Sequence, residues 1–239
     1  MTTATATQDS RTAAQAKRRA RSRQRWGSAR TYIFAAVIVI WCLLPAYWMV
    51  VTAFRDVGFT YDATPFFSHI TLDNFRAAFS TDTGNHLTRA LVNSLIVGVI
   101  TTIISLLFGI FTSYALARLN FRAKYLVLGF ILAASMFPGV ALVTPLFQLF
   151  TNLNWIGTYQ ALIIPYISFA LPLTIYILVS FFREMPWELE ESARIDGCTK
   201  AQAFRKIIMP LAAPGVFTTA ILAFISSWNE FLIASQLSN

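Results

Sequence analysis

Four long stretches of the chain contain no Asp, Glu, Lys or Arg, and they lie at 31–54, 90–117, 125–182 and 207–229. A helix needs about 20 apolar residues to cross the hydrocarbon core of a bilayer. The first, second and fourth stretches each fit one crossing, and the third is long enough for two. The pattern therefore predicts an all-α membrane protein whose five spans lie at about 31–54, 90–117, 125–150, 159–182 and 212–237.

Positive charge is placed unevenly about these spans. Of the 19 Lys and Arg residues, eight lie in 1–30, three in 118–124 and five in 183–206. Cytoplasmic segments of membrane proteins carry an excess of Lys and Arg, so the N-terminus is predicted to be cytoplasmic and the protein to be multi-pass in the cytoplasmic membrane. These segments would contact anionic membrane lipid. A net charge of +8 placed in this way does not indicate nucleic-acid binding.

Residues 1–30 are rich in Thr, Ala, Gln and Arg and have no apolar periodicity, which predicts a disordered basic tail. The rest of the chain, 31–239, is predicted to form one transmembrane domain. Within it, the segment 71–79 between the first two spans could form a short amphipathic helix on the membrane surface.

Residues that could carry enzymatic chemistry are few and scattered. Cys42 and Cys198 allow no disulfide framework, and neither His69 nor His86 has a partner at metal-ligand spacing. The chain has no Gly-x-x-x-x-Gly-Lys-Ser/Thr nucleotide loop. We expect no catalytic site, no cofactor and no metal.

The loop at 183–211, between the fourth and fifth spans, has a pattern of its own. Three glutamates lie in the opening turns of a predicted helix, where they complement the helix dipole. Gly197 suits the left-handed residue that stops a helix, and Thr199 to Gln202 match a capping box for a second helix that Pro210 would end. Such an amphipathic pair could shield the membrane interface or could dock onto a cytoplasmic partner. The pattern alone does not separate these two hypotheses.

A longer motif in this loop resembles a known one. The run Glu191-Ser-Ala-Arg-Ile-Asp-Gly197, followed after nine residues by Ile207-Ile-Met-Pro210, resembles the EAA loop of ABC importer permeases. That loop reads Glu-Ala-Ala, three residues, Gly, nine residues, Ile-x-Leu-Pro, so Ser192 and Met209 are mild departures. Flanking segments resemble the carbohydrate-uptake branch with its maltose-type inner subunits, and among these the actinobacterial trehalose or disaccharide permeases. These segments are 182–187, 210–215, 228–232 and Met136-Phe-Pro138.

The resemblance covers about 31–239 and implies the transmembrane bundle of a type I ABC importer, with a coupling helix that seats in a separate ATPase. Its expected partners are a second permease subunit, a dimeric ABC ATPase and an extracellular or lipid-anchored sugar-binding protein. The family pattern has six spans and five are visible, so we expect the sixth to be truncated or lost. The chain is expected to be a transport subunit, with ATP hydrolysis carried by the partner ATPase.

The same resemblance implies that the imported solute is trehalose or another di- or oligosaccharide, with another polar solute as the alternative. A secondary carrier is less favoured because four of the five predicted spans carry no ionisable residue. The residues expected to couple to the ATPase are Glu190, Glu191, Ser192, Ala193, Asp196, Gly197, Phe204 and Pro210.

The translocation path has a weaker signature. Proline and glycine near mid-bilayer predict irregular backbone beside a cavity, although they could equally kink packing helices. Prolines at 138, 145, 165 and 172 are expected to interrupt the third and fourth spans. Glu230, the acid inside a span, could be a gate or a binding-protein contact, or an interfacial residue bonded to Asn229 or Trp228. The candidate path residues are Ser135, Pro138, Thr144, Gln148, Asn229 and Glu230.

Overall fold

The structure is a computed structural model that describes residues 30–80 and 86–238. The predicted tail therefore lies, apart from Arg30, outside the described residues. The chain divides into two compact units, Met1–Leu87 and Thr88–Asn239, and each is described by itself. Helices dominate both units, and one isolated bridge between Arg55 and Ile70 is the β-structure found in the described part of the chain.

Four of the described helices are long and apolar enough to cross a membrane: Arg30–Ala53, Leu87–Arg118 (α3), Tyr159–Glu184 (α6) and Lys200–Trp228. The helices α4 (Lys124–Ser135) and α5 (Gly139–Asn152) would add a fifth crossing if together they form one span. The five predicted spans therefore match the upper limit of what these helices allow.

The third predicted span, at about 125–150, is not one continuous helix, and the interruption expected at Pro138 is confirmed, because α4 and α5 meet there at a bend of 85°. Pro138 causes the break. It has extended backbone at ψ 116° and lacks the N–H that a continuous helix would use. The interruptions expected at Pro145, Pro165 and Pro172 are wrong, because these residues lie inside α5 and α6. Membrane helices tolerate such prolines where neighbouring groups satisfy the freed backbone.

The last long helix begins earlier than predicted. It runs through α8 (Lys200–Ala203), a π-helical turn labelled η2 (Phe204–Ile208) and α9 (Met209–Trp228). Pro210 does not end a helix, as the sequence suggested, but lies inside this long helix, just after the π-helical turn. The predicted span 212–237 also divides, because α9 ends at Trp228 and a short α10 (Leu232–Leu237) follows.

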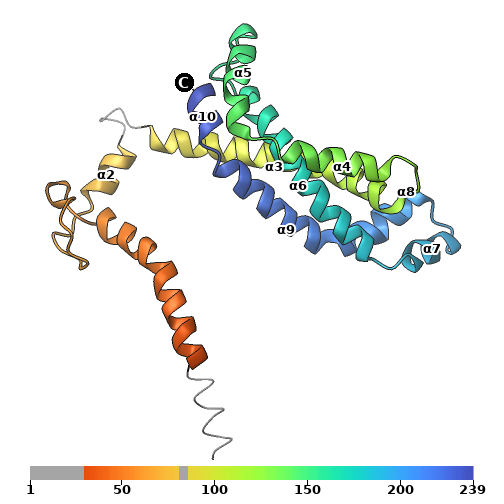
Figure 1. Cartoon of the computed structure of the whole chain (residues 1–239), viewed down its shortest axis with the longest axis horizontal. Coiled ribbons are helices and arrows are strands. Elements are labelled where there is room, and N and C mark those ends of the chain that lie inside the picture. Colours follow the sequence, from red (N-terminus) through yellow and green to blue (C-terminus); the bar gives the residue numbers. More distant parts are fainter. Residues whose placement is uncertain (1–29, 81–85, 239) are drawn as a thin grey trace, which may run out of the picture. The chain divides into compact units, whose positions relative to one another are not determined.

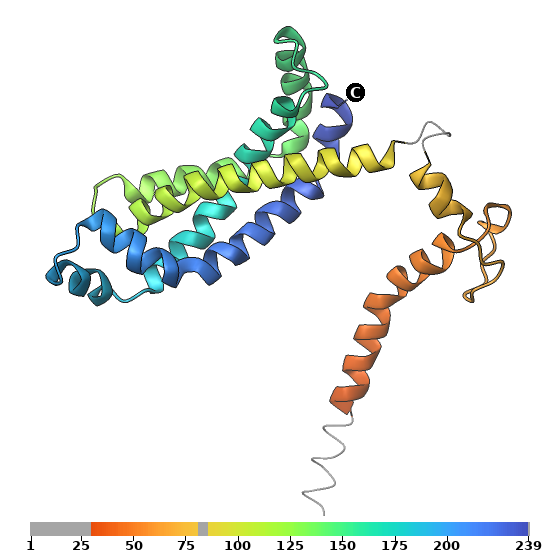
Figure 2. The ribbon, with the colours of Figure 1, turned by 180° about the vertical axis from the view of Figure 1, so that it is seen from behind.

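The second unit is built around α6. Leu178 and Phe182 of α6 pack on Ile208 and Ala212 from the last long helix. Leu116 of α3 packs on another side of α6, against Ile175 and Val179. Figures 1 and 2 show that α7 (Glu188–Ile195) and α10 lie at opposite ends of this unit.

Small residues let these helices approach closely. A Cβ atom added at Gly109 of α3 would lie 2.5 Å from Thr174 Cγ2 of α6, and one added at Gly215 of α9 would lie 2.5 Å from the Phe181 ring. Membrane helices associate largely by such close packing, because lipid tails offer no hydrophobic driving force between them.

In the first unit, the segment that follows the helix Arg30–Ala53 folds around the side chain of Arg55. The Arg55 side chain is 1% exposed, and its guanidinium donates to the backbone carbonyls of Asp62, Thr64 and Phe66. Asn74 of α2 (Asp73–Phe79) donates to the carbonyl of Arg55 at 2.7 Å, and this bond holds α2 beside Arg55.

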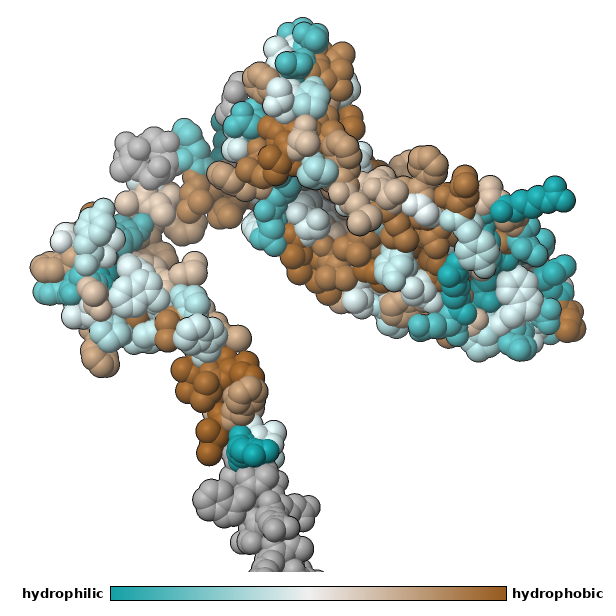
Figure 3. All heavy atoms as spheres, in the orientation of Figure 1, coloured by the Kyte–Doolittle hydropathy of each residue, from teal (hydrophilic) through white to brown (hydrophobic). Residues whose placement is uncertain are grey.

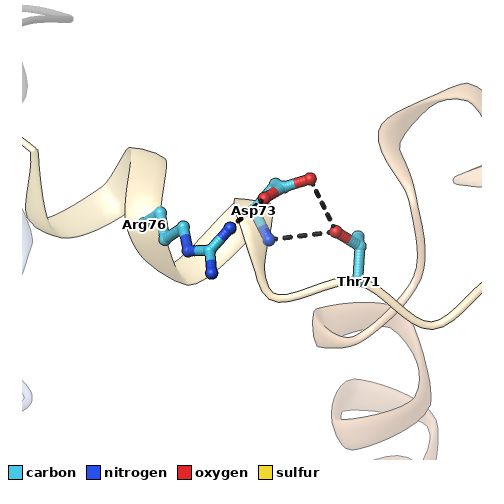
Figure 4. Close-up of polar contacts among 3 residues, drawn as sticks. All are labelled: Thr71, Asp73 and Arg76. Atoms are coloured by element: carbon cyan, nitrogen blue, oxygen red, sulfur yellow. Dashed lines mark hydrogen bonds and ion pairs between the residues drawn. The ribbon is translucent and has the colours of Figure 1, made fainter.

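The short helix predicted at 71–79 is confirmed as α2. Figure 4 shows how its first turn is held. Thr71 Oγ1 accepts the Asp73 N–H at 3.1 Å and donates to the Asp73 carboxylate, which also pairs with Arg76 at 3.1 Å.

Replacing Gly109 by Ala is expected to lower the unfolding midpoint of the detergent-solubilised protein. Thr174 is 1% exposed, so it has little room to move away from the added methyl group. Overpacking of this kind costs about 1–3 kcal/mol. Gly129→Ala is the matched control, because a Cβ atom there meets nothing within 4 Å. Thermal melts that place the two variants at the same midpoint would contradict the packing described.

Candidate functional site

The loop between α6 and α9 folds as the sequence predicted, as helix, glycine turn and helix. α7 carries Glu188, Glu190 and Glu191 in its first turn. Gly197 then turns the chain with φ +87°, a left-handed conformation that glycine adopts without strain. Thr199 and Gln202 form a complete capping box at the start of α8.

The two faces of α7 differ sharply. Glu190 and Ala193 point into the protein and are 6% and 1% exposed. Ser192 and Ile195 point outward, and Ile195 is 86% exposed although it is apolar. Glu191, Asp196 and Gly197 are exposed as well. Hydrophilic side chains gather around this end of the unit, while the helices beyond it show an apolar surface (Figure 3).

The buried carboxylate of Glu190 is held by α3. Tyr114 Oη donates to Glu190 Oε1 at 2.8 Å. The Tyr114 ring is fixed in turn by Phe204, with ring centroids 4.6 Å apart, and by Phe182 at 5.8 Å. Glu190 Oε2 is buried and has no hydrogen-bond partner among the described residues.

One helical turn further along α3, Arg118 makes a second connection to the loop. It is 8% exposed, and its Nη2 donates to the Met185 carbonyl at 2.9 Å. Its guanidinium carbon lies 5.3 Å from the centre of the Trp187 ring, and Trp187 Nε1 donates to Glu191 Oε1 at 3.0 Å. Arg118 Nε is buried without a partner in the described chain.

Tyr114 and Arg118 were not predicted from the sequence. Their spacing of four residues puts them on one face of α3 at its end, and a polar pair placed in this way after an apolar run was a usable signal. Between them and the loop lies a cavity of about 440 Å³. It is lined among others by Phe111, Tyr114, Arg118, Glu190, Arg194 and Phe204.

At the opposite end of the unit, Glu230 lies in the break between α9 and α10. Its carboxylate accepts the hydroxyl of Tyr166 at 2.9 Å and the backbone N–H groups of Ile233 and Ala234 at 3.1 and 3.2 Å. Of the two hypotheses left open for Glu230, the bond to Asn229 or Trp228 is not found among the described hydrogen bonds of its carboxylate. Glu230 instead caps the start of α10 and ties it to α6.

A second cavity of about 210 Å³ adjoins Glu230. It lies beside Gly139, where α5 begins after the break at Pro138, and Tyr166 and Phe169 of α6 also line it. Of the predicted path residues, Glu230 lines this cavity. The side chains of Thr144, Gln148 and Asn229 are exposed elsewhere on the surface, and Ser135 Oγ donates to the Leu132 carbonyl.

Among residues 30–80 and 86–238, no group of three or more His, Cys, Asp or Glu side chains could hold a metal ion. The carboxylates of Glu190 and Glu230 instead lie at the two ends of the helical unit, where one holds the α7 loop and the other holds the break before α10.

Comparison with known proteins shows the family to which this chain belongs. The family model of the binding-protein-dependent transport system inner membrane component matches residues 105–239. The chain belongs to this family. The matched region begins in α3 and includes the broken pair α4 and α5, the α7 loop and both cavities.

Curated relatives of this permease are similar over most of its length. The trehalose transport system permease protein SugB of Mycobacterium tuberculosis is 44% identical, over 86% of this chain and 74% of that protein. The sulfoquinovosyl glycerol transport system permease protein SmoH of Agrobacterium fabrum is 41% identical, over 89% and 74%. The trehalose/maltose transport system permease protein MalG of Thermococcus litoralis is 38% identical, over 84% and 72%.

A solved structure shows the same fold. It is the crystal structure of a bacterial ABC transporter involved in the import of the acidic polysaccharide alginate. Its matched chain superposes with a TM-score of 0.73 at 20% identity, over 90% of this permease and 75% of that chain. The permease is therefore a multi-pass membrane protein with the transmembrane fold of an ABC importer.

Replacing Glu230 by Ala is expected to loosen α10. The change removes the acceptor for two backbone N–H groups, and a lost cap of this kind costs about 1 kcal/mol. Hydrogen exchange at Ile233 and Ala234 should therefore speed up several-fold. Glu230→Gln keeps one acceptor oxygen and should show a smaller effect. Unchanged protection in Glu230→Ala would refute the capping role.

Proposed function

We propose that this permease forms half of the translocation path of an ATP-driven sugar importer and couples to a separate ATPase through the loop 183–211. The observation that carries the coupling role is the outward face of α7. Ile195 is 86% exposed on a helix that joins two membrane helices, at the hydrophilic end of the unit. Apolar side chains presented by an amphipathic helix are suited to a groove in a protein partner.

The proposed solute is trehalose or another di- or oligosaccharide. Relatives named for trehalose, for trehalose and maltose, and for diacetylchitobiose support this class. The relative named for sulfoquinovosyl glycerol keeps a different polar solute as the alternative. The secondary carrier that the sequence disfavoured has no relative among these proteins to support it.

The proposed partners are a second permease subunit, a dimeric ABC ATPase and an extracellular or lipid-anchored sugar-binding protein. The 239 residues contain no nucleotide loop, which supports an ATPase carried by a separate polypeptide. Basic residues at 1–30, 118–124 and 183–206 support a cytoplasmic N-terminus, and with that orientation α7 would lie in the cytoplasm, on the side of the proposed ATPase.

The eight predicted coupling residues take two different roles in this proposal. Glu191, Ser192, Asp196 and Gly197 are exposed and would meet the ATPase directly. Glu190, Ala193, Phe204 and Pro210 would set the position of α7, because the first two are buried and the other two belong to the helix that follows.

At the other end, the cavity between Glu230 and Gly139 is the proposed part of the translocation path. A broken span places irregular backbone beside it, which membrane proteins allow where the backbone faces protein or a water-filled cavity. Tyr166 and Glu230 would offer a sugar hydroxyl both a donor and acceptors there. Ser135, Thr144, Gln148 and Asn229 have less support as path residues.

Replacing Ile195 by Asp is expected to release the ATPase without unfolding the permease. The side chain is already exposed, so the change removes no internal contact. Burial of an isoleucine in a partner's groove is worth about 1.5–3 kcal/mol, so the affinity should fall at least about tenfold. The measurement is the amount of ATPase that co-purifies from native membranes in mild detergent.

Ile195→Leu is the matched control, because it keeps an apolar side chain of the same size and should retain the ATPase. Undiminished co-purification with Ile195→Asp would exclude this face as the docking surface. Absence of any ATPase from the folded wild-type permease would reject the coupling role as a whole.

Proteoliposomes that hold the permease and its three proposed partners are expected to take up labelled trehalose or another disaccharide only when ATP is present on the ATPase side. Uptake driven by a proton or sodium gradient without ATP would point to a secondary carrier. Uptake of sulfoquinovosyl glycerol in place of any disaccharide would favour the alternative solute.

A further inference from the structure

We propose that Tyr114 and Arg118 of α3 are the positioning residues through which movement of α7 reaches the membrane helices. The proposal rests on the coupling function proposed above and assigns the step that follows ATPase docking. The residues concerned are named the α3–α7 contact, and they are Tyr114, Arg118, Met185, Trp187 and Glu190.

The α3–α7 contact connects segments that are far apart in the sequence. Tyr114 reaches Glu190 across 76 positions, and Arg118 reaches Met185 across 67. One bond therefore holds α7 itself, and the other holds the backbone between α6 and α7. Both arise from the last turns of α3, a helix of 32 residues that starts near the other end of the unit. Because α3 is one continuous helix, a shift of α7 would displace α3 along its whole length.

The chemistry of the contact favours a role in positioning over simple filling of space. Glu190 is a carboxylate that is 6% exposed, and no salt bridge to it is present in the described chain. Burying a charge is costly unless it is hydrogen-bonded, so the Tyr114 hydroxyl supplies much of what keeps Glu190 in place. An aliphatic residue at 190 would fill the same space without this cost.

The contact also has unused bonding capacity. Glu190 Oε2 and Arg118 Nε are both buried without a partner, and their side chains line the same cavity of about 440 Å³. These groups carry opposite charges. Movement of α7 into the cavity would let them pair, whereas the present arrangement keeps Glu190 on Tyr114 and Arg118 on the Met185 carbonyl. The unpartnered atoms would give the contact a second set of bonds, and two available sets are what a two-position coupling element requires.

The exposed residues of α7 have no part in these bonds, with the exception of Glu191, which accepts from Trp187. Docking and transmission therefore use different faces of the helix. The outward face meets the ATPase, and the inward face carries its displacement to α3. It follows that the two steps can be separated by mutation.

The test uses the full importer, reconstituted in proteoliposomes with its ATPase, second permease and binding protein. Tyr114→Phe removes one hydroxyl and keeps the ring. We expect the ATPase to stay bound and basal ATP hydrolysis to persist. Stimulation of hydrolysis by loaded binding protein, and the sugar imported per ATP, should fall about tenfold, which corresponds to about 1.4 kcal/mol of coupling. Tyr176→Phe is the matched control, since that side chain of α6 is 49% exposed.

A second pair of variants separates transmission from folding. Glu190→Gln keeps an acceptor for Tyr114 and should retain most of the coupling, whereas Glu190→Ala should lose it. The double variant Tyr114→Phe with Glu190→Ala should be no worse than the poorer single variant, because both remove the same bond. Thermal melts in detergent confirm that each variant is folded.

Full stimulation and a normal sugar-to-ATP ratio in Tyr114→Phe and Glu190→Ala would overturn the proposal. So would a loss of basal and stimulated hydrolysis in equal proportion, which indicates a merely structural role. If the wild-type permease fails to bind an ATPase at all, the failure belongs to the proposed coupling function and not to the α3–α7 contact.

Discussion

Backbone polar groups inside a bilayer must be satisfied by the protein itself, and this constraint determines where the permease can be regular and where it can break. Long helices satisfy it without help, which is why charge-free stretches become α3, α6 and α9. Each break needs a substitute partner. At 229–231, the carboxylate of Glu230 supplies it by accepting two N–H groups of α10. The break is therefore built into the sequence, since the acid and the helix it caps are adjacent.

The same constraint explains which spans and which breaks could be predicted from the sequence. Absence of charge is a strong signal for helices in lipid, so three spans were found within a few residues and a further one as a bent pair. The last span was placed too late in the chain, because its helix begins at Lys200 among charged residues. Proline was a weaker guide. Pro145, Pro165 and Pro172 remain inside helices, while Pro138 produces a bend of 85°. Which proline breaks a helix depends on the groups available around it, and that is tertiary information.

The loop 183–211 was predicted well because its signals are local. Glutamates at a helix start, a glycine with φ +87° and a capping box act within a few residues of one another. The burial of Glu190 could not be predicted in this way. Its partner Tyr114 lies in another helix, and only the packing of α3 against α6 and the last helix brings the two together.

The two ends of the helical unit use carboxylates for related purposes. Glu230 holds α10 against Tyr166 of α6, beside the broken span. Glu190 holds α7 against Tyr114 of α3, beside the proposed docking surface. In both places a tyrosine hydroxyl and a carboxylate fix a short helix that regular backbone bonding would leave loose. The proposed solute cavity at one end and the proposed coupling loop at the other are thus attached to the same set of long helices.

The division of α7 into a docking face and a transmitting face is the central claim, and site-directed photo-cross-linking along 188–197 tests it most directly. A photoreactive side chain would be placed at one position at a time in the assembled importer, and cross-links to the ATPase would be scored. The account predicts cross-links from Ser192 and Ile195, which are exposed, and none from Glu190 and Ala193, which are buried against α3 and its neighbours. Cross-links from Glu190 and Ala193 with none from Ser192 and Ile195 would contradict it.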